Sequence, residues 1–337
     1  MREPRFWYGP VSLGSVLLAP IAACYGAVAA ARLAREGTRA GCPVICIGNY
    51  HVGGAGKTPT TLRLVEILRE IGETPVVVSR GYGGTLAGPV RVNETHRAAD
   101  VGDEPKMMAR HVPVIVARDR VEGAELARRE GASVVLLDDG FQNPALAKDA
   151  AVIVIDAARG LGNRMIFPAG PLRAPLAPQV ARTNALIVIG EGHAADDIAQ
   201  GVVQRGGLVV RAAFVPEESS LARLRGARVL AFAGIGDPGR FFATLAKHGV
   251  ELASRKEFAD HHPFTEAELK ALADEAQAGG LTLVTTEKDL ARIEGDPALA
   301  AYAAQIVPFA VTLRVEDEGA LLDFLKARMR RARQARQ

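Results

Sequence analysis

The chain has 337 residues, of which 48% are hydrophobic and 23% charged, so its length allows about two domains with large apolar cores. A formal net charge of only +3 gives no overall basic field and argues against a nucleic-acid-binding protein. The three cysteines (Cys24, Cys42 and Cys46) have neither CxxC spacing nor companion histidines, which excludes a disulfide framework and a zinc motif and favours a reduced, cytosolic catalytic body.

The first predicted element is an uncharged apolar segment, residues 6–31, with arginines on both sides. It is long enough to be a transmembrane helix, and IAAC at 21–24 resembles the cleavage box of an exported lipoprotein. Export would place the nucleotide site, which is described next, outside the compartment that contains ATP, and this argues against an export signal. Because the segment is alanine-rich and interrupted by Pro20, we expect a helix that lies on or dips into a membrane.

A phosphate-binding loop is predicted next. Residues 43–47 form a short apolar run typical of a buried strand, a glycine-rich turn follows, and a helical pattern begins at Lys57. Backbone N–H groups of such a loop and the helix N-terminus bind phosphate oxygens. Lys57 would reach the β- and γ-phosphates, and the Thr58 hydroxyl would bind Mg²⁺. His51 replaces the usual first glycine, so we expect a variant loop that relies on Gly53 and Gly54.

Further strands are predicted at 75–79, 112–117, 133–137, 151–156 and 185–189, alternating with helical segments. This alternation predicts a mostly parallel sheet whose functional site lies at the carboxyl ends of the strands. Polar clusters occur at these ends, or in the loops between them: RGYGG (80–84), GDEP (102–105), DDGFQ (138–142) and PAGPLR (168–173). Their common position is the reason to place them in one site.

Near residue 206 the pattern restarts as a second, smaller α/β unit. Residues 208–215 and 306–315 bracket it and could pair as a two-stranded hinge. We therefore expect four parts: a membrane-associated helix (1–35), a phosphate-loop domain (36–206), a smaller α/β domain with the hinge strands (207–315), and a closing helix with a basic tail (316–337). The last twelve residues carry six positive charges and no negative ones, typical of a solvated helix end or of a surface that meets anionic lipid or phosphate.

Two acidic pairs narrow the chemistry. Asp103–Glu104 and Asp138–Asp139 offer a Mg²⁺ ligand and a base that takes a proton from an acceptor hydroxyl, although Asp also caps helices well. In the second unit, His261 and His262 follow Asp260 in a loop; they are candidates for catalysis or for a structural role. Lys288 would contact the nucleotide or be solvated. Arginines at strand ends would suit a phosphorylated acceptor or form surface ion pairs.

Taken together, the motifs resemble one family. They are GGAGKTP (53–59) preceded by Asn49, SRGYGG (79–84), GDEP, DDGFQ, PAGPLR, GIGDPGRFF (234–242), ADH (259–261) and TTEKD (285–289). In this order, up to about residue 313, the chain is similar to the tetraacyldisaccharide 4′-kinases of lipid A synthesis. The resemblance implies an α/β fold with a P-loop NTPase-like, mostly parallel sheet and a second α/β domain. It also implies transfer of the γ-phosphate of ATP, with Mg²⁺, to the 4′-hydroxyl of a tetraacylated glucosamine disaccharide 1-phosphate.

The same resemblance implies a peripheral or monotopic enzyme at the cytoplasmic face of the bacterial inner membrane. Its partners would be the lipid A disaccharide monophosphate acceptor and the membrane lipid surface, with neither nucleic acid nor an obligatory protein partner.

Residue roles follow from the resemblance and from the residue types. Asp103 would be the base, His261 its partner and Glu104 a Mg²⁺ partner. One position departs from the family pattern: Asn143 stands where the family has histidine, which places acceptor binding, or its pH dependence, in question. The expected catalytic residues are Asp103, His261 and Lys57. The expected nucleotide-binding residues are Asn49, Gly53, Gly54, Ala55, Gly56, Lys57, Thr58 and Lys288. The expected metal ligands are Thr58, Glu104 and Asp139, and the expected acceptor-binding residues are Arg80, Asp138, Gln142, Asn143 and Arg173.

Two other classes of protein share a phosphate loop. One is a switch-type ATPase or GTPase that hydrolyses nucleotide with water, and the other is a module that binds nucleotide without turnover. The apolar N-terminal segment and the separate histidine-bearing unit favour the kinase.

Overall fold

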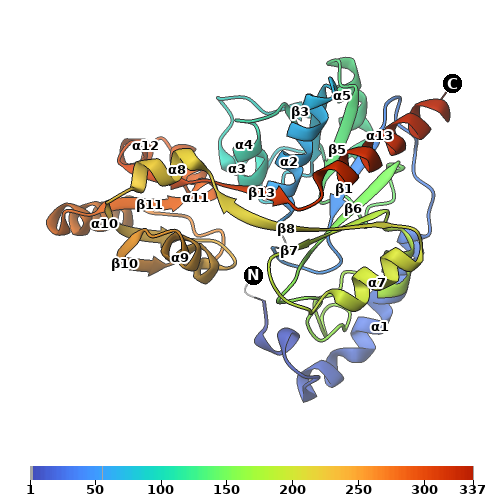
Figure 1. Ribbon diagram of the computed structural model, residues 1–337, viewed down its shortest axis with the longest axis horizontal. Helices are drawn as coiled ribbons and strands as arrows, with labels where there is room; N and C mark the ends of the chain where they lie inside the picture. Colours follow the sequence, from blue (N-terminus) through green and yellow to red (C-terminus); the bar gives the residue numbers. More distant parts are fainter. Residues whose placement is uncertain (1–2, 55, 337) are drawn as a thin grey trace.

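Two sheets organise the chain in the computed structural model, which describes residues 3–54 and 56–336 (Figure 1). The nine-stranded sheet has the order β13-β8-β7-β6-β1-β5-β2-β4-β3. Its strands are β1 (Val44–Gly48), β2 (Pro75–Ser79), β3 (Val90–Arg91), β4 (Val114–Val116), β5 (Val134–Asp138), β6 (Ala150–Asp156), β7 (Ala185–Ile189), β8 (Leu208–Pro216) and β13 (Val311–Val315). All neighbouring strands are parallel except β3 with β4 and β13 with β8. The expected α/β class with a mostly parallel sheet is confirmed.

Helices cover both faces of this sheet, which explains why its central strands are continuous apolar runs. One face packs against α2 (Lys57–Glu70), α4 (Asp103–Met108) and α13 (Glu318–Gln334). The other face packs against α5 (Arg120–Arg129), α6 (Leu176–Ala181) and α7 (Asp196–Gln204). We call this body the larger unit.

The smaller unit is a parallel four-stranded sheet of order β10-β9-β11-β12. Its strands are β9 (Arg228–Ala233), β10 (Glu251–Glu257), β11 (Thr282–Thr286) and β12 (Ile306–Phe309). Helices α10 (Glu266–Gly279), α11 (Glu287–Glu294) and α12 (Ala300–Ala303) cover one face, and α8 (Glu218–Leu224) and α9 (Pro238–Lys247) cover the other. Its core is separate from the two cores of the larger unit, apart from Ala291 of α11, which packs into one of them.

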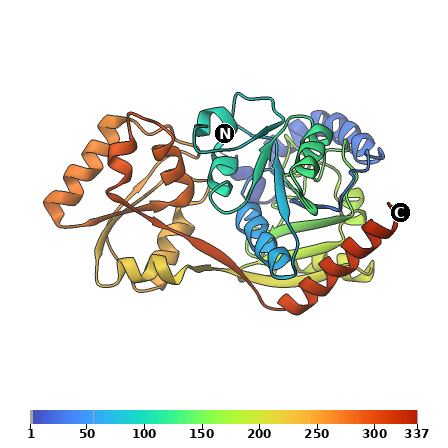
Figure 2. The ribbon, with the colours of Figure 1, turned by 90° about the horizontal axis from the view of Figure 1, so that it is seen from above.

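The chain passes between the units twice, through β8 into α8 and from β12 into β13 (Figure 2). Strand β13 pairs antiparallel with β8, from Val311 opposite Pro216 to Val315 opposite Ala212. The pairing expected for 208–215 with 306–315 thus occurs only over 311–315, because Ile306–Phe309 belongs to the smaller sheet as β12.

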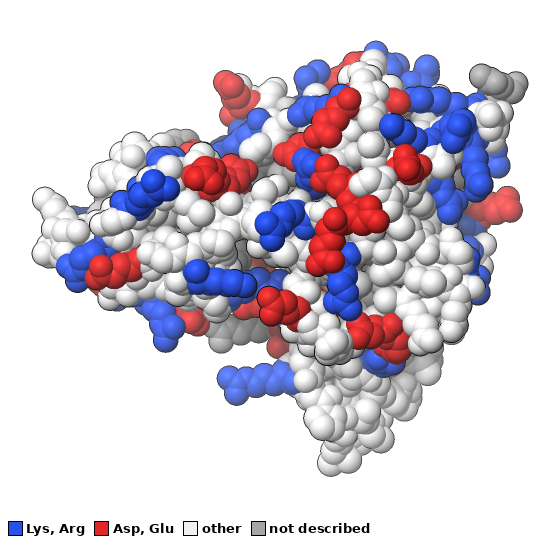
Figure 3. Space-filling view, in the orientation of Figure 1, with Lys and Arg blue, Asp and Glu red and all other residues white. Residues whose placement is uncertain are grey.

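The N-terminal segment forms a short 3-10 helix, η1 (Arg5–Tyr8), and a 21-residue helix, α1 (Leu13–Leu33), which contains an 18-residue window of mean hydropathy 1.8. One face of α1 is buried, and at Gly26 a Cβ would meet the Ile166 side chain at 2.7 Å, so glycine allows close packing there. The opposite face exposes large apolar side chains: Leu13, Val16, Leu17, Ile21 and Val28. This end of the molecule, at the bottom of Figure 3, shows almost no charge.

The basic C-terminal tail continues α13, whose Leu321, Leu325 and Met329 are buried against the larger sheet. In its last turns Arg333 pairs with Glu73 at 2.6 Å and Arg336 pairs with Asp149 at 2.7 Å. Figure 1 places this end of the chain at the opposite edge of the larger unit from α1. These arginines therefore bind the end of α13 to the larger unit through ion pairs. The sequence analysis expected either a solvated helix end or a surface for anionic lipid or phosphate, and it did not describe these ion pairs.

Candidate active site

The phosphate loop connects β1 to α2, as expected, but its glycine requirement differs from the expectation. Gly53 and Gly56 have φ of 109° and 89°, in the left-handed region that favours glycine, whereas Gly54 and His51 do not lie there. The loop thus relies on Gly53 and Gly56, and a histidine is accommodated at position 51. Ala55 lies outside the described residues.

His51 is buried at the start of the loop, with 2% of its surface exposed. Its backbone bridges to Leu172, and the N–H of Val52 donates to the carbonyl of Pro171 at 2.8 Å, so the PAGPLR segment lies alongside the loop. Burial, aided by the nearby Lys57 charge, lowers the pKa of His51 to about 3. The imidazole is therefore neutral at physiological pH.

The N-terminal segment reaches the phosphate loop through the same neighbourhood. The Trp7 indole donates to the carbonyl of Pro168 at 3.1 Å, and Asn163 donates to Ser15 in the first turn of α1 at 3.2 Å. Glu3 pairs with Arg159, and its carboxylate lies against Gly53, where a Cβ would overlap it. Helix α1 is thus tied to the loop by side chains from residues 3–15.

Lys57 and Arg173 converge on Asp139 at the end of β5. The Lys57 ammonium lies 3.8 Å from Asp139 Oδ1, and Arg173 donates to the same oxygen at 2.7 Å. Burial alone would raise the pKa of Asp139, but these two cations lower it to about 2. Asp139 has φ of 50°, a conformation that few non-glycine residues adopt.

Asp138, its neighbour, has a different environment. It is 2% exposed, Oδ2 accepts from the Ser79 hydroxyl at 3.3 Å, and Oδ1 has no partner among the described residues. Burial raises its pKa, and the nearby Glu104 and Asp139 charges add to this effect. A buried carboxylate oxygen without a partner, next to a phosphate loop, fits a position for a cation.

Gln142 and Asn143 are engaged within the protein. The Gln142 amide donates to the Asn49 carbonyl at 2.7 Å and to Gln179 at 2.9 Å, and Asn49 in turn donates to the Gly53 carbonyl at 3.1 Å. Asn143 Oδ1 accepts from the N–H of Ala145 at 2.8 Å. Gln142 therefore supports the junction between β1 and the phosphate loop.

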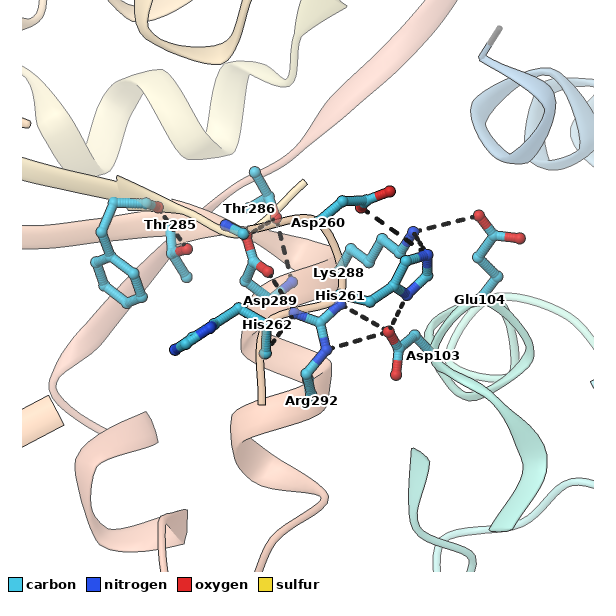
Figure 4. A network of polar contacts seen from close by, with 12 residues as sticks. Asp103, Glu104, Asp260, His261, His262, Thr285, Thr286, Lys288, Asp289 and Arg292 are labelled. Atoms are coloured by element: carbon cyan, nitrogen blue, oxygen red, sulfur yellow. Dashed lines mark hydrogen bonds and ion pairs between the residues drawn. The ribbon is translucent and has the colours of Figure 1, made fainter. Parts of the chain in front are cut away.

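The second acidic pair opens α4, with Gly102 at the N-cap, so neither carboxylate serves as the cap. Asp103 Oδ2 accepts from the His261 Nδ1 atom at 2.9 Å and from Arg292 Nε and a terminal guanidinium nitrogen at 3.1 and 2.6 Å. Glu104 lies 3.4 Å from the Lys288 ammonium. Figure 4 shows these side chains meeting between α4 of the larger unit and the smaller unit.

The two histidines after Asp260 have different surroundings. His261 has φ of 57°, points to Asp103, and its Nε2 atom lies 3.5 Å from Lys288. His262 pairs with Glu268 at 3.0 Å and packs against Phe258 and Phe264. The structure thus brings His261 to the acidic pair and leaves His262 half-buried against Phe258 and Phe264 of the smaller unit.

Arg292 is a site residue that the sequence analysis missed. It lies one helical turn after Lys288 in α11 and is held by Asp289 at 2.8 Å while it binds Asp103. Burial alone would raise the pKa of Asp103, but hydrogen bonds from His261 and Arg292 lower it to about 2. The available signal was the i, i+4 spacing from Lys288, which places both cations on one helix face.

A glycine loop between a buried parallel strand and a helix, with acidic residues at the end of the adjacent strand, defines a P-loop nucleoside-triphosphate-binding fold. A family model described as tetraacyldisaccharide-1-P 4′-kinase matches residues 14–330. The chain belongs to this family.

Relatives support the assignment along the whole chain. A tetraacyldisaccharide 4′-kinase of Nitrobacter winogradskyi is 64% identical, over 96% of this chain and 97% of the relative. One of Rhodopseudomonas palustris is 63% identical, over 100% of this chain and 98% of the relative. Among solved structures, LpxK from Aquifex aeolicus in complex with ATP is similar, with a TM-score of 0.72 and 25% identity over 94% of this chain and 99% of that one.

Proposed function

We propose that this protein transfers the γ-phosphate of ATP to the 4′-hydroxyl of a tetraacylated glucosamine disaccharide 1-phosphate in lipid A biosynthesis. The observation that carries the proposal is the meeting of Asp103 with His261 and Arg292, supplied by the other unit, beside a phosphate loop. A sugar hydroxyl is a poor nucleophile, so its phosphorylation needs a positioned base as well as a bound nucleotide.

The nucleotide would lie on the loop. Backbone N–H groups around Gly53 and Gly56 would bind its phosphates, and Lys57 would move from Asp139 to the β- and γ-phosphates. Lys288, which reaches toward the same region from α11, would contact the nucleotide from the smaller unit. Asn49 would act indirectly, because its side chain holds the Gly53 carbonyl.

Mg²⁺ fits the oxygen donors of this site. Thr58 and Glu104 would hold it together with Oδ1 of Asp138, which has no partner in the described part of the chain. Bound there, it would neutralise charge on the transferred phosphoryl group. Asp139, the ligand expected from the sequence, is engaged by Lys57 and Arg173 in this arrangement. It would become available once Lys57 has moved to the nucleotide phosphates and Arg173 to the acceptor phosphate.

Asp103 would take the proton of the acceptor hydroxyl through Oδ1. Its other oxygen is held by His261 and Arg292, so the carboxylate has a fixed orientation. Because these partners come from the smaller unit, the base is complete only when the units are together, which would limit hydrolysis of ATP by water. Strands β8 and β13 would be the hinge.

The acceptor would approach beside the SRGYGG loop. Arg80 is exposed at the end of β2, and the exposed Tyr82 ring lies 6.3 Å from the His261 ring. Arg80 and Arg173 would meet its phosphate. Gln142 and Asn143 would act on the acceptor indirectly, because their side chains hold other groups of the larger unit, and Asp138 would act through Mg²⁺. The exposed apolar face of α1 would hold the enzyme at the cytoplasmic face of the inner membrane, where a tetraacylated lipid resides.

The test is incubation of γ-labelled ATP with a lipid A disaccharide monophosphate and the purified protein. We expect label in the lipid. Label only in free phosphate would support a switch-type NTPase instead, and no release would support a nucleotide sensor. Lys57→Ala should lower the transfer rate about 10²- to 10³-fold, because it removes charge stabilisation of the transferring group. Near-normal turnover in that variant would exclude this loop as the nucleotide site.

A further inference from the structure

A second polar contact joins the two units, at a distance in the sequence from the residues already assigned. Asp156 ends β6 and is 3% exposed. Its Oδ2 accepts a hydrogen bond from the Arg240 guanidinium in α9, and its Oδ1 accepts from the N–H groups of Ala158 and Arg159 at 2.9 and 2.8 Å. Arg240 belongs to GIGDPGRFF, a motif to which the proposed mechanism gives no role.

This contact lies on the other side of the phosphate loop from Asp103. In the larger sheet β6 is a neighbour of β1 on one side, whereas β5, β2 and β4, next to which α4 packs, lie on the other side. The smaller unit therefore touches the larger one on both sides of the strand that leads into the phosphate loop. Two separated contacts fix the orientation of a rigid body better than one.

The charges at Asp156 favour the closed arrangement. A buried carboxylate without a counter-charge is destabilising. Arg159 binds Asp156 through its backbone N–H, while its guanidinium is paired with Glu3. Arg240 is held in the first turn of α9, where its N–H donates to the N-cap residue Asp237 at 3.1 Å. Moving the smaller unit away would leave Asp156 with only its two backbone donors.

We propose that Arg240 is a positioning residue: by pairing with Asp156 it holds the smaller unit across the phosphate loop, so that His261 meets Asp103. The inference rests on the proposed role of His261. It predicts that Arg240 acts on the rate of transfer through the placement of His261, without touching the reacting atoms.

Arg240→Ala should lower kcat for transfer about 10- to 100-fold, because small misplacements of catalytic groups have effects of this size. KM for ATP should change less than about threefold, because Arg240 lies in the smaller unit and does not touch the phosphate loop. Arg240→Lys should recover part of the rate, since it keeps the charge but not the planar donor group. Asp156→Asn should reproduce the loss, because it removes the negative charge that pairs with Arg240. The local structure should persist, because the amide oxygen can still accept from the N–H groups of Ala158 and Arg159. Arg228→Ala, which breaks an exposed ion pair with Glu251 in the same unit, is the matched control and should leave kcat unchanged.

The deciding measurement is a double-mutant cycle with His261→Ala. In that background Arg240→Ala should cost less than about twofold, since the group it positions is absent. The proposal is overturned if Arg240→Ala or Asp156→Asn retains kcat within about twofold of the parent, or if the losses of Arg240→Ala and His261→Ala multiply. Full activity of His261→Ala alone would instead refute the proposed role of His261, which separates the two failures.

Discussion

Asp103 shows how a carboxylate can be oriented and charged by a neighbouring unit. Three donors from the smaller unit bind one of its oxygens, and its pKa falls to about 2 although burial acts in the opposite direction. At neutral pH the group is therefore ionised, as its proposed role as general base requires. A base with so low a pKa gains from orientation more than from basicity.

Asp103→Ala and His261→Ala should each lower kcat about 10²- to 10⁴-fold, the range for loss of a general base, with little change in KM for ATP. The double variant should be little slower than either single variant, because the two side chains act as one unit. Steady-state kinetics of all three proteins test this. Losses that multiply would mean that His261 binds nucleotide or acceptor independently of Asp103.

Arg292→Gln should raise the pKa of Asp103, because the carboxylate loses its charged partner while its burial remains. Protonation of Asp103 would then begin at a higher pH, so the acidic limb of the kcat/KM profile should move to higher pH. The profile is measured from pH 4.5 to 8, a range in which the parent, with an Asp103 pKa of about 2, should show no acidic limb from this residue. Arg292→Lys, which keeps the positive charge, is the control and should move the limb less. An unchanged limb in Arg292→Gln would show that Arg292 does not govern the Asp103 charge.

Among the elements, buried strands were the easiest to predict. The ranges 75–79 and 185–189 coincide with β2 and β7, and the predicted strand 43–47 is shifted by one residue in β1. Strands buried on both faces are continuous apolar runs, so their limits are visible in the sequence. The division of 306–315 into β12 and β13 was not visible, because only Ala310 separates the two strands and no glycine or polar residue marks the boundary.

The candidate site was predictable where a motif places a residue at a strand end or helix start, as for Lys57, Asp103 and Asp139. Contacts between the units were not predictable from periodicity. Arg292 and Arg240 are ordinary helical arginines in the sequence, and only the packing of the smaller unit brings them to Asp103 and Asp156. The requirement for glycine at 53 and 56 depends on backbone dihedrals that composition does not reveal.

Helix α1 yields a prediction about membrane binding. Leu17→Asp with Ile21→Asp adds two charges to side chains that are 71% and 59% exposed, so folding should be unaffected while the apolar face is lost. We expect weaker binding to anionic lipid vesicles in flotation assays and a higher KM for the lipid acceptor, because the local acceptor concentration falls. Ala271→Asp with Ala278→Asp adds the same charge to exposed positions of α10 and should leave both unchanged. Equal flotation of the two double variants would show that α1 serves packing alone.

For the molecule as a whole, the two units contribute groups of opposite charge to the proposed nucleotide site and its surroundings. The larger unit supplies the loop and both acidic pairs, and the smaller one supplies cations: Lys288, Arg292 and Arg240. Each cation pairs with a carboxylate of the larger unit in this arrangement. Figure 3 shows a depression between the two bodies. The opposite charges of the two units thus favour the closed arrangement.

The pH dependence of global stability should reflect His51. Its pKa in the folded protein is about 3, below the ordinary 6.5, so the unfolded chain binds more protons between these values. Stability from this residue is therefore complete above pH 6.5 and is lost as pH falls toward 3, by up to about 1.4 kcal/mol per pH unit. In His51→Gln, the midpoint of urea unfolding should change less between pH 7 and pH 5 than it does in the parent. Asp138, whose raised pKa acts in the opposite direction, is present in both proteins and cancels. Parallel pH profiles for parent and variant would contradict the assignment.

The docking of the N-terminal segment has a practical consequence. Trp7 is the one tryptophan of the chain, it is 3% exposed, and its indole is bound to the carbonyl of Pro168, in the segment that borders the phosphate loop. The unmodified protein therefore carries a single tryptophan, which lies between its apolar N-terminal helix and the phosphate loop. Selective excitation of the indole reports on the surroundings of Trp7 alone. Lipid vesicles and nucleotide can therefore be titrated separately and together. A shift of the emission maximum would show whether one ligand changes the environment of Trp7 when the other is bound.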